Sequence, residues 1–300
     1  MVSADRAPHA GDNMKRATLI LGLACGACGA PSPSPAAPDH ARAAPAASAS
    51  EPAAPDPALL AAISGTVRTD KERARDAARH PAETLTFFGV RPDSRVVELW
   101  PGGGWYTAIL GPYLRERGQL TITHFDPNGD PESYDTKESK QILDRLAAAP
   151  AAFGKVSGQQ IAPPNVVLGP EGSADVVLTF RNIHNWIEAG YDAQVFGAIA
   201  RVLRPGGVLG VEEHRASREL TLKEMNESGY VSEAHVIQLA EAAGLKLEAR
   251  SEINANAKDT KDHPHGVWSL PPSYQGKDVD RDKFTAIGES DRMTLRFRKP

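Results

Sequence analysis

Apolar residues recur along the chain with two different periods, and the two periods alternate. Residues 57–63 and 71–88 come first and carry apolar side chains at helical spacing. Short apolar runs bounded by Gly, Pro or charged residues then predict strands. The predicted strands are 95–99, 119–125, either 155–161 or 165–168, 174–180, 208–213, 245–253 and 293–297. Between them, helical spacing predicts helices over 105–117, 136–149, 191–203 and 232–243.

This order of elements predicts the fold class. Strands that alternate with helices of ten or more residues form a mostly parallel sheet with helices on both faces. In such α/β sheets, ligands bind outside the carboxyl ends of the strands. The residues that follow each predicted strand are therefore the candidates for a functional site.

The first 56 residues have a different composition. Met14, Lys15 and Arg16 precede a short apolar run over residues 17–24, which is the pattern of a secretory signal, with Met14 as the start. The following Ala-, Pro- and Ser-rich stretch cannot bury a core. We therefore expect a leader over residues 1–28, a disordered linker over 29–56 and a folded domain over 57–300.

Both cysteines of the chain, Cys25 and Cys28, directly follow the apolar run. Three interpretations stay open: a redox or metal-binding pair, a lipoprotein cleavage site whose lipidated cysteine tethers the protein to a membrane, and two small residues in a discarded peptide. A redox pair would need a folded strand-to-helix context. The expected location is outside the cytoplasm, periplasmic or lipid-anchored, or cytoplasmic if the leader is not functional.

Composition and net charge limit the classes of partner that the chain is expected to bind. The 300 residues are 41% hydrophobic and 24% charged, as in ordinary globular proteins, and the net charge is −4. Without a basic field, nucleic acid is not an expected partner. No apolar run approaches the roughly 18 to 20 residues of a membrane-spanning helix.

The first predicted strand ends in a glycine-rich turn that includes Glu98, Gly102, Gly103 and Gly104. Glycine lets a ligand approach the backbone closely, and the helix that follows offers unpaired N–H groups. Asp126 comes 22 residues after Gly104 at the tip of the next strand, where a carboxylate can bind ribose hydroxyls. Thr107 stands where a dinucleotide fingerprint has its third glycine. The pattern therefore favours a ligand with an adenosine and no phosphates over NAD.

Three runs follow one another along the chain: E-L-W-P-G-G-G-W-Y at residues 98–106, F-R-N-I-H-N-W at 180–186 and G-E-S-D-R-M at 288–293. In this order they resemble the runs of class I S-adenosylmethionine-dependent methyltransferases, and more narrowly those of a bacterial family of predicted methyltransferases. The resemblance implies S-adenosylmethionine as cofactor and a Rossmann-like seven-stranded sheet whose last strand is antiparallel. It places the cofactor on Glu98, Gly102, Gly103, Gly104, Tyr106, Asp126 and Arg181. Trp100 departs from the general pattern by replacing the first glycine of the turn.

The methyl acceptor is expected at the ends of the fourth and fifth strands. His184 is the candidate general base because its ordinary pKa, near 6.5, suits neutral pH; a structural histidine is the alternative. Asn182 is expected to orient the acceptor or the cofactor. Trp186 and Tyr106 either attract the sulfonium or form a wall. His214 is the third catalytic candidate, within a run of titratable residues (Glu212, Glu213, His214 and Arg215) that is costly to bury unless used or paired.

A long polar segment over residues 254–287 separates the last two strands, and we expect it to cover the acceptor pocket. Asp262, His263 and His265 lie in it, but adjacent chelators in a polar loop are usually solvated, so no metal site is predicted. The leading hypothesis is methyl transfer to a small molecule. An exported adenosine-binding protein without catalysis is the alternative, because S-adenosylmethionine is made inside the cell, and an NAD-dependent oxidoreductase is the weaker one.

Overall fold

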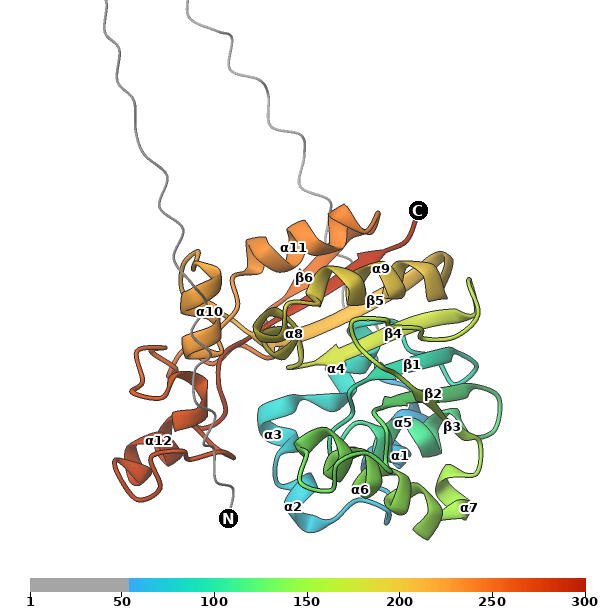
Figure 1. Ribbon diagram of the computed structural model, residues 1–300. Coiled ribbons are helices and arrows are strands. Elements are labelled where there is room, and N and C mark those ends of the chain that lie inside the picture. Colours follow the sequence, from blue (N-terminus) through green and yellow to red (C-terminus); the bar gives the residue numbers. More distant parts are fainter. Residues whose placement is uncertain (1–53) are drawn as a thin grey trace, which may run out of the picture. The chain divides into compact units, whose positions relative to one another are not determined.

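The computed structural model describes residues 54–300, so the predicted leader, both cysteines and most of the predicted linker lie outside the described residues. The described residues form a seven-stranded sheet with the strand order β3-β2-β1-β4-β5-β7-β6 (Figure 1). The strands are β1 (Arg95–Leu99), β2 (Gln119–His124), β3 (Val156–Gln160), β4 (Ala174–Phe180), β5 (Leu203–His214), β6 (Lys246–Ser251) and β7 (Arg292–Arg298). The pairs among β1 to β5 are parallel, and β7 is antiparallel to β5 and β6, which confirms the predicted fold class.

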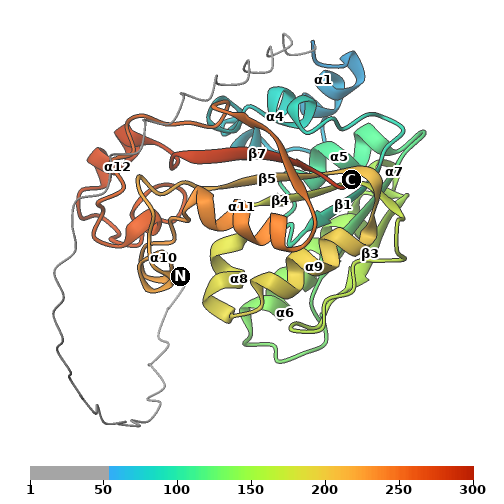
Figure 2. The same ribbon diagram turned by 90° about the horizontal axis from the view of Figure 1, so that it is seen from above.

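Helices cover both faces of the sheet. The helices are α1 (Pro57–Ile63), α2 (Asp70–Arg73), α3 (Asp76–Arg79), α4 (Pro81–Phe87), α5 (Thr107–Leu114), α6 (Tyr134–Ala148), α7 (Pro150–Phe153), α8 (Ile183–Ala189), α9 (Asp192–Val202), α10 (Leu222–Ser228), α11 (Glu233–Ala242), α12 (Arg281–Ile287) and the short 3-10 helix η1 (Gly266–Ser269). Figure 2 shows α4 and α5 on one side of the central strands and α8, α9 and α11 on the other.

The strand residues alternate between two hydrophobic cores, as the period of two requires. Val96, Val176 and Leu178 face the core under α1, α4 and α5. Val97 and Val177 face the core under α8, α9 and α11. Burial on both faces explains why these strands are continuous apolar runs.

One predicted segment differs from the structure, and the structure decides between the two alternatives for another. Residues 71–88 do not form one helical stretch: His80 takes a left-handed backbone with φ of 42°, and Pro81, which lacks an N–H, begins α4. The third strand follows the first of the two alternatives, since β3 spans Val156–Gln160.

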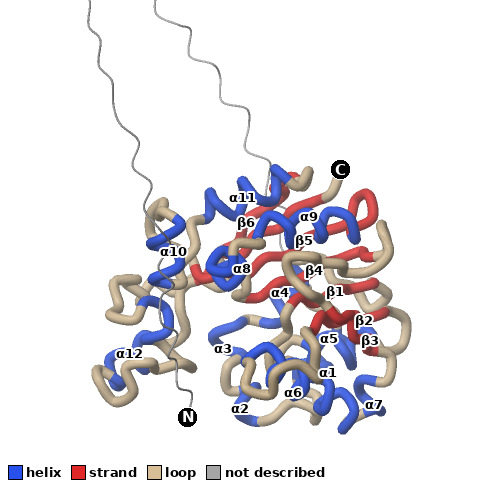
Figure 3. The backbone as a smooth tube through the Cα atoms, viewed as in Figure 1, coloured by secondary structure: helices blue, strands red, loops and turns tan. Residues whose placement is uncertain are grey.

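The segment over 254–287 is mostly loop and carries η1 and α12 (Figure 3). Among the described helices, none has the length and apolar character needed to cross a membrane.

Candidate active site

The turn after β1 keeps the backbone of a glycine turn although its first glycine is replaced. Trp100 has φ of 44°, Gly102 of 54° and Gly104 of 77°, so all three are left-handed. For an L-residue this conformation costs about 1 to 2 kcal/mol. The Trp100 ring packs against Phe125 and Trp186, with ring centroids 5.8 and 5.1 Å away. Aromatic packing therefore holds the turn in the shape that a glycine would adopt without strain.

The glycines of the turn serve two purposes. A Cβ on Gly104 would lie 2.4 Å from Cδ1 of Ile142, so this glycine permits close packing of α6 on the turn. A Cβ on Gly102 would meet only the Glu138 carboxylate, at 3.3 Å, and one on Gly103 only the end of Gln141, at 3.5 Å. A ligand can therefore reach the turn at Gly102 and Gly103, where flexible side-chain ends of α6 would have to turn aside.

Glu98 lies beneath this turn. Its side chain is buried, and its Oε2 accepts a hydrogen bond from the Thr107 hydroxyl at 2.7 Å. Burial raises the pKa of Glu98 to about 7, against the smaller opposite effect of that hydrogen bond. Thr107, which sequence analysis used only to argue against NAD, thus ties the end of β1 to the start of α5. Glu98 supports the turn from inside.

Asp126 is the second residue after the end of β2 and is exposed. One carboxylate oxygen, Oδ1, accepts the N–H of Asn128 at 2.9 Å, which fixes the side chain in an Asx turn. Because β1 and β2 are paired in parallel, with Glu98 opposite Ile122, Asp126 and the glycine turn lie at the same edge of the sheet. An exposed carboxylate beside an accessible glycine backbone fits a nucleoside whose sugar hydroxyls need an acceptor.

No predicted site residue lines the cavity of about 550 Å³ beside α9. That cavity is bordered by Pro164, Asn165, Val166, Val167, Ala193, Gln194, Gly197 and Arg201. The candidate site is instead the surface formed by the residues that follow the strand ends.

Asn182 connects two strand ends. It stands at the N-cap position of α8 without a side-chain capping hydrogen bond, and its side-chain amide donates to the Leu99 carbonyl at 3.0 Å and to the Thr179 hydroxyl at 3.3 Å. The side chain is buried. These contacts fasten the turn after β4 to the end of β1, so Asn182 holds the two halves of the candidate site together.

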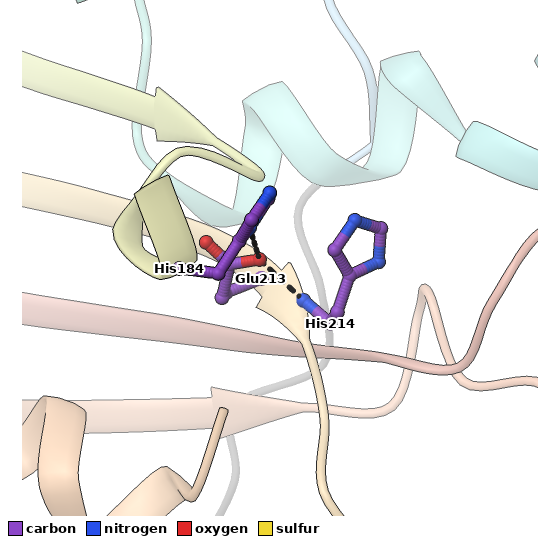
Figure 4. Close-up of side chains that lie close together, drawn as sticks. All are labelled: His184, Glu213 and His214. Atoms are coloured by element: carbon purple, nitrogen blue, oxygen red, sulfur yellow. Dashed lines mark hydrogen bonds and ion pairs between the residues drawn. The ribbon is translucent and has the colours of Figure 1, made fainter. Parts of the chain in front are cut away.

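His184 and Glu213 form a buried pair (Figure 4). Nδ1 of His184, in the first turn of α8, lies 3.0 Å from Oε1 of Glu213, which also accepts the backbone N–H of His214 at 2.8 Å. The other oxygen, Oε2, accepts the N–H of Ile183 at 2.6 Å. When Nδ1 of His184 carries the ring proton and donates a hydrogen bond to Glu213, Nε2 carries the lone pair and is the nitrogen that can accept. The pair can therefore accept a proton at Nε2.

His214 completes this group. Its Nδ1 lies 2.6 Å from the Ser290 hydroxyl, and its ring centroid is 5.2 Å from that of His184. Burial, and then repulsion from neighbouring positive charges such as that of Arg181, hold the pKa of His214 well below its usual value. His184, Glu213 and His214 each offer a metal-ligating atom, and these atoms lie within 4.8 Å of one another.

Glu212 belongs to a separate ionic network on the opposite side of β5. Its fully buried carboxylate accepts hydrogen bonds from Arg181 at 2.9 Å and Tyr106 at 3.3 Å, and pairs with Arg292 at 3.0 Å. Burial opposes ionisation of Glu212, but the charges of Arg181 and Arg292 outweigh it and lower its pKa. The prediction that Glu212, Glu213 and His214 follow the fifth strand is wrong, because they are the last residues of β5. Glu212 and Glu213 are buried and paired, as their burial cost requires.

The network continues to the N-terminal helices through Glu289. This carboxylate binds Nε of Arg75 at 2.6 Å, Nε of Arg79 at 3.0 Å and Nη1 of Arg292 at 2.9 Å. Burial, followed by the charge of Arg181, lowers the pKa of Arg79 to about 9. Four guanidinium groups therefore share two carboxylates at the ends of β4, β5 and β7.

Tyr106 and Arg181, both expected to contact the cofactor, lie in this network. The Tyr106 ring is buried and stacks on Phe180 with centroids 3.6 Å apart. Arg181 has a left-handed backbone with φ of 60°, and its side chain is partly exposed. Of these two residues, Arg181 is therefore the one whose side chain a ligand can reach.

The segment over 254–287 reaches the same edge of the sheet. Its Trp268 ring lies 6.1 Å from the ring of His184. His263 does not join Asp262 or His265: its Nε2 lies 2.9 Å from Oδ1 of Asp259, a buried carboxylate that also accepts the Tyr230 hydroxyl. The predicted lid thus contributes an aromatic wall beside His184, and its histidine anchors the loop.

Sequence analysis missed Arg75, Arg79, Glu289, Ser290 and Arg292 as parts of this edge. Three of them lie in the G-E-S-D-R-M run, which was quoted for its resemblance and given no role. Three charged residues and a hydroxyl at the start of an apolar strand were a usable signal, because burial demands partners for them.

No model of a known protein family matches the chain, and no curated protein sequence matches it. Solved structures do. A SAM dependent methyltransferase from Aquifex aeolicus is 13% identical, with 76% of this chain and 93% of that chain covered and a TM-score of 0.50. The [4+2]-cyclase SpnF is 13% identical, with 81% and 92% covered and a TM-score of 0.55.

At this identity the likeness concerns the fold. The chain has the fold of the class I S-adenosylmethionine-dependent methyltransferases. One of the two similar structures is named as a cyclase, so the fold by itself leaves the reaction to be argued from the site.

Proposed function

We propose that this protein is an S-adenosylmethionine-dependent methyltransferase that acts on a small molecule. The observation that carries the proposal is the pairing of a left-handed glycine-type turn at residues 100–104 with the exposed carboxylate of Asp126 at one sheet edge. Asp126 would bind the ribose hydroxyls, and the backbone of Gly102 and Gly103 would lie against the nucleoside. The bound cofactor would supply a methyl group activated on a sulfonium.

The acceptor would lie at the ends of β4 and β5. There Nε2 of His184 accepts a proton from the acceptor, and the buried Glu213 carboxylate stabilises the resulting imidazolium through Nδ1. Arg181 follows β4 with a partly exposed side chain at the same strand ends and would orient an acceptor that carries negative charge. Alignment of acceptor and methyl group supplies much of the catalysis in such a displacement, up to about 7 to 11 kcal/mol.

Isothermal titration tests the cofactor. We expect S-adenosylmethionine to bind the purified chain and NAD to give no heat of binding. Binding of NAD with no response to S-adenosylmethionine would overturn the proposal in favour of an oxidoreductase.

The predicted leader favours a second candidate, an exported protein that keeps the adenosine site and performs no chemistry. Formation of S-adenosylhomocysteine with cell extract as the pool of acceptors distinguishes the two. Turnover supports the enzyme, whereas binding without turnover supports the carrier.

We also propose that the leader exports the protein and that a lipid on Cys25 or Cys28 holds it at a membrane. Fractionation of a C-terminally tagged chain tests this. Recovery in the cytoplasm at full length would refute export, and release from the membrane fraction by Cys25→Ser together with Cys28→Ser would support the lipid.

A further inference from the structure

His184, Glu213 and His214 bring three metal-ligating atoms together, which methyl transfer does not require. We infer that these three residues bind a divalent transition-metal ion, of the class represented by Zn²⁺. The proposal concerns metal binding. A metal ion between Nδ1 of His184 and Oε1 of Glu213 would replace the hydrogen bond between them, so the general-base role of this pair belongs to the metal-free protein.

The donor set fits such an ion. Two imidazoles and one carboxylate suit zinc and its neighbours among the transition metals, whereas magnesium and calcium prefer oxygen ligands. Metal–nitrogen and metal–oxygen bonds of about 2.0 to 2.2 Å place neighbouring ligand atoms about 3 to 3.5 Å apart. Nδ1 of His184 and Oε1 of Glu213 are already 3.0 Å apart, and all three ligand atoms lie within 4.8 Å of one another. Small side-chain rotations that bring the three atoms to about 3 to 3.5 Å from one another would complete the site.

Outer contacts hold the ligands in place. The Ser290 hydroxyl lies 2.6 Å from Nδ1 of His214, which leaves Nε2 of that ring for a metal. The N–H of Ile183 holds Oε2 of Glu213 at 2.6 Å. A hydrogen bond to the second ring nitrogen or carboxylate oxygen is the usual way in which proteins orient metal ligands.

The charges around the group permit a cation. Arg181 and Arg292 lie nearby, but both are paired with the buried carboxylate of Glu212. His214 is partly exposed, so an ion can enter from solvent.

Three protein ligands leave a coordination position free, as in catalytic rather than structural metal sites. The Trp268 and Tyr230 rings, 6.1 Å from His184 and 6.5 Å from His214, border the group. A hydroxyl group of a ligand that occupied the free position would lose its proton more readily than in water.

The test measures Zn²⁺ binding to the full chain. Cys25→Ser and Cys28→Ser are present in every sample, so that the cysteine pair cannot bind the metal. After chelator treatment and its removal, competition with a chromophoric chelator gives stoichiometry and affinity. We expect one Zn²⁺ per chain, and a loss of affinity of more than about 100-fold in His184→Ala and in His214→Ala.

Two further variants sharpen the result. Ser290→Ala should weaken binding by about 10-fold, because it removes only the contact that orients His214. His235→Ala is the matched control: His235 lies on α11 beside Asp192, with 3.4 Å between Nε2 and Oδ2, and its loss should leave the affinity unchanged.

Absence of tight Zn²⁺ binding in the parent chain, or equal binding in the parent and the His184→Ala, His214→Ala double variant, would overturn the inference. Thermal unfolding of each apo variant shows whether it folds. Titration with S-adenosylmethionine on the same metal-free samples reports on the proposed function separately, so the two proposals fail independently.

Discussion

Nδ1 of His184 and Oε1 of Glu213 lie 3.0 Å apart, and the carboxylate of Glu213 has no exposed surface. The same carboxylate accepts two backbone N–H groups, from Ile183 and His214. Three donors compensate its burial, so it is a fixed negative charge that orients one face of the imidazole. The opposite ring nitrogen, Nε2, is then the atom that can take a proton.

Glu213→Gln should therefore reduce catalysis without reducing cofactor binding. The amide stabilises a protonated His184 less, and the loss of general-base catalysis is expected to lower S-adenosylhomocysteine formation by about 100-fold or more. The dissociation constant of S-adenosylmethionine, measured by titration, should stay within a factor of about two. Glu188→Gln, an exposed position on α8, the helix that carries His184, is the control. Undiminished turnover in Glu213→Gln would contradict the role of the pair.

Asp126→Ala should weaken S-adenosylmethionine binding. Each charge-assisted hydrogen bond to a ribose hydroxyl contributes about 1.5 to 3 kcal/mol, so the dissociation constant should rise by about 10- to 150-fold per lost bond. Asp130→Ala is a close match, because Asp130 is exposed in the same loop and makes the same Asx contact, 2.9 Å to the N–H of Glu132. Equal affinity of the two variants would show that Asp126 does not bind the sugar.

The alternation of strands and helices could be predicted because the pattern of apolar and polar residues within each element reflects which of its faces are buried. The strand β4, for example, was predicted with its observed bounds, since it is apolar on both faces and ends at charged Arg181. The broken helix over residues 71–88 was missed because its spacing is helical, whereas the left-handed His80 is a property of one backbone angle.

The candidate site was predictable only in outline. The strand-end rule selected His184 and Glu213, but their pairing depends on β4 and β5 lying side by side, which no local pattern encodes. The contacts of Arg75 and Arg79 with Glu289 join residues more than 200 positions apart. Such long-range pairs follow from the assembled fold alone.

At position 100, a glycine variant should be more stable than an alanine variant, which is the reverse of the usual order of stability. Both Trp100→Gly and Trp100→Ala lose the packing against Phe125 and Trp186, which costs about 3 to 5 kcal/mol. Only glycine adopts φ of 44° without strain. Trp100→Gly should therefore be more stable than Trp100→Ala by about 1 kcal/mol in urea unfolding. Greater stability of the alanine variant would mean that the turn has another backbone conformation in solution.

Glu289→Gln should destabilise the fold strongly, because it leaves Arg75, Arg79 and Arg292 without their common carboxylate. Removing one partner of a buried ionic network costs about 3 to 5 kcal/mol. Glu248→Gln is the comparison: Glu248 binds Arg298 at 2.7 Å but is partly exposed, so the expected loss is below about 1 kcal/mol. Chemical unfolding at neutral pH measures both, and equal losses would argue against a structural role for the Glu289 network.

Glu98 predicts a pH dependence of stability with a definite sign. Burial raises its pKa from 4.5 to about 7 in the folded chain, so the native state binds more protons than the unfolded state between these values. Stability from this group is fully present below pH 4.5 and is lost as the pH rises toward 7, with an amplitude on the order of 3 kcal/mol.

Glu98→Gln mimics the protonated carboxyl and keeps an oxygen for the Thr107 hydroxyl, so it should lack this loss. Urea unfolding of both chains at pH 5 and pH 8 measures the difference, and all other titrating groups cancel in the comparison. Relative to the parent, Glu98→Gln should gain stability between pH 5 and pH 8. Glu116→Gln, at an exposed position, should follow the parent at both pH values. Parallel behaviour of Glu98→Gln and the parent would mean that Glu98 is ionised in the native state throughout this range.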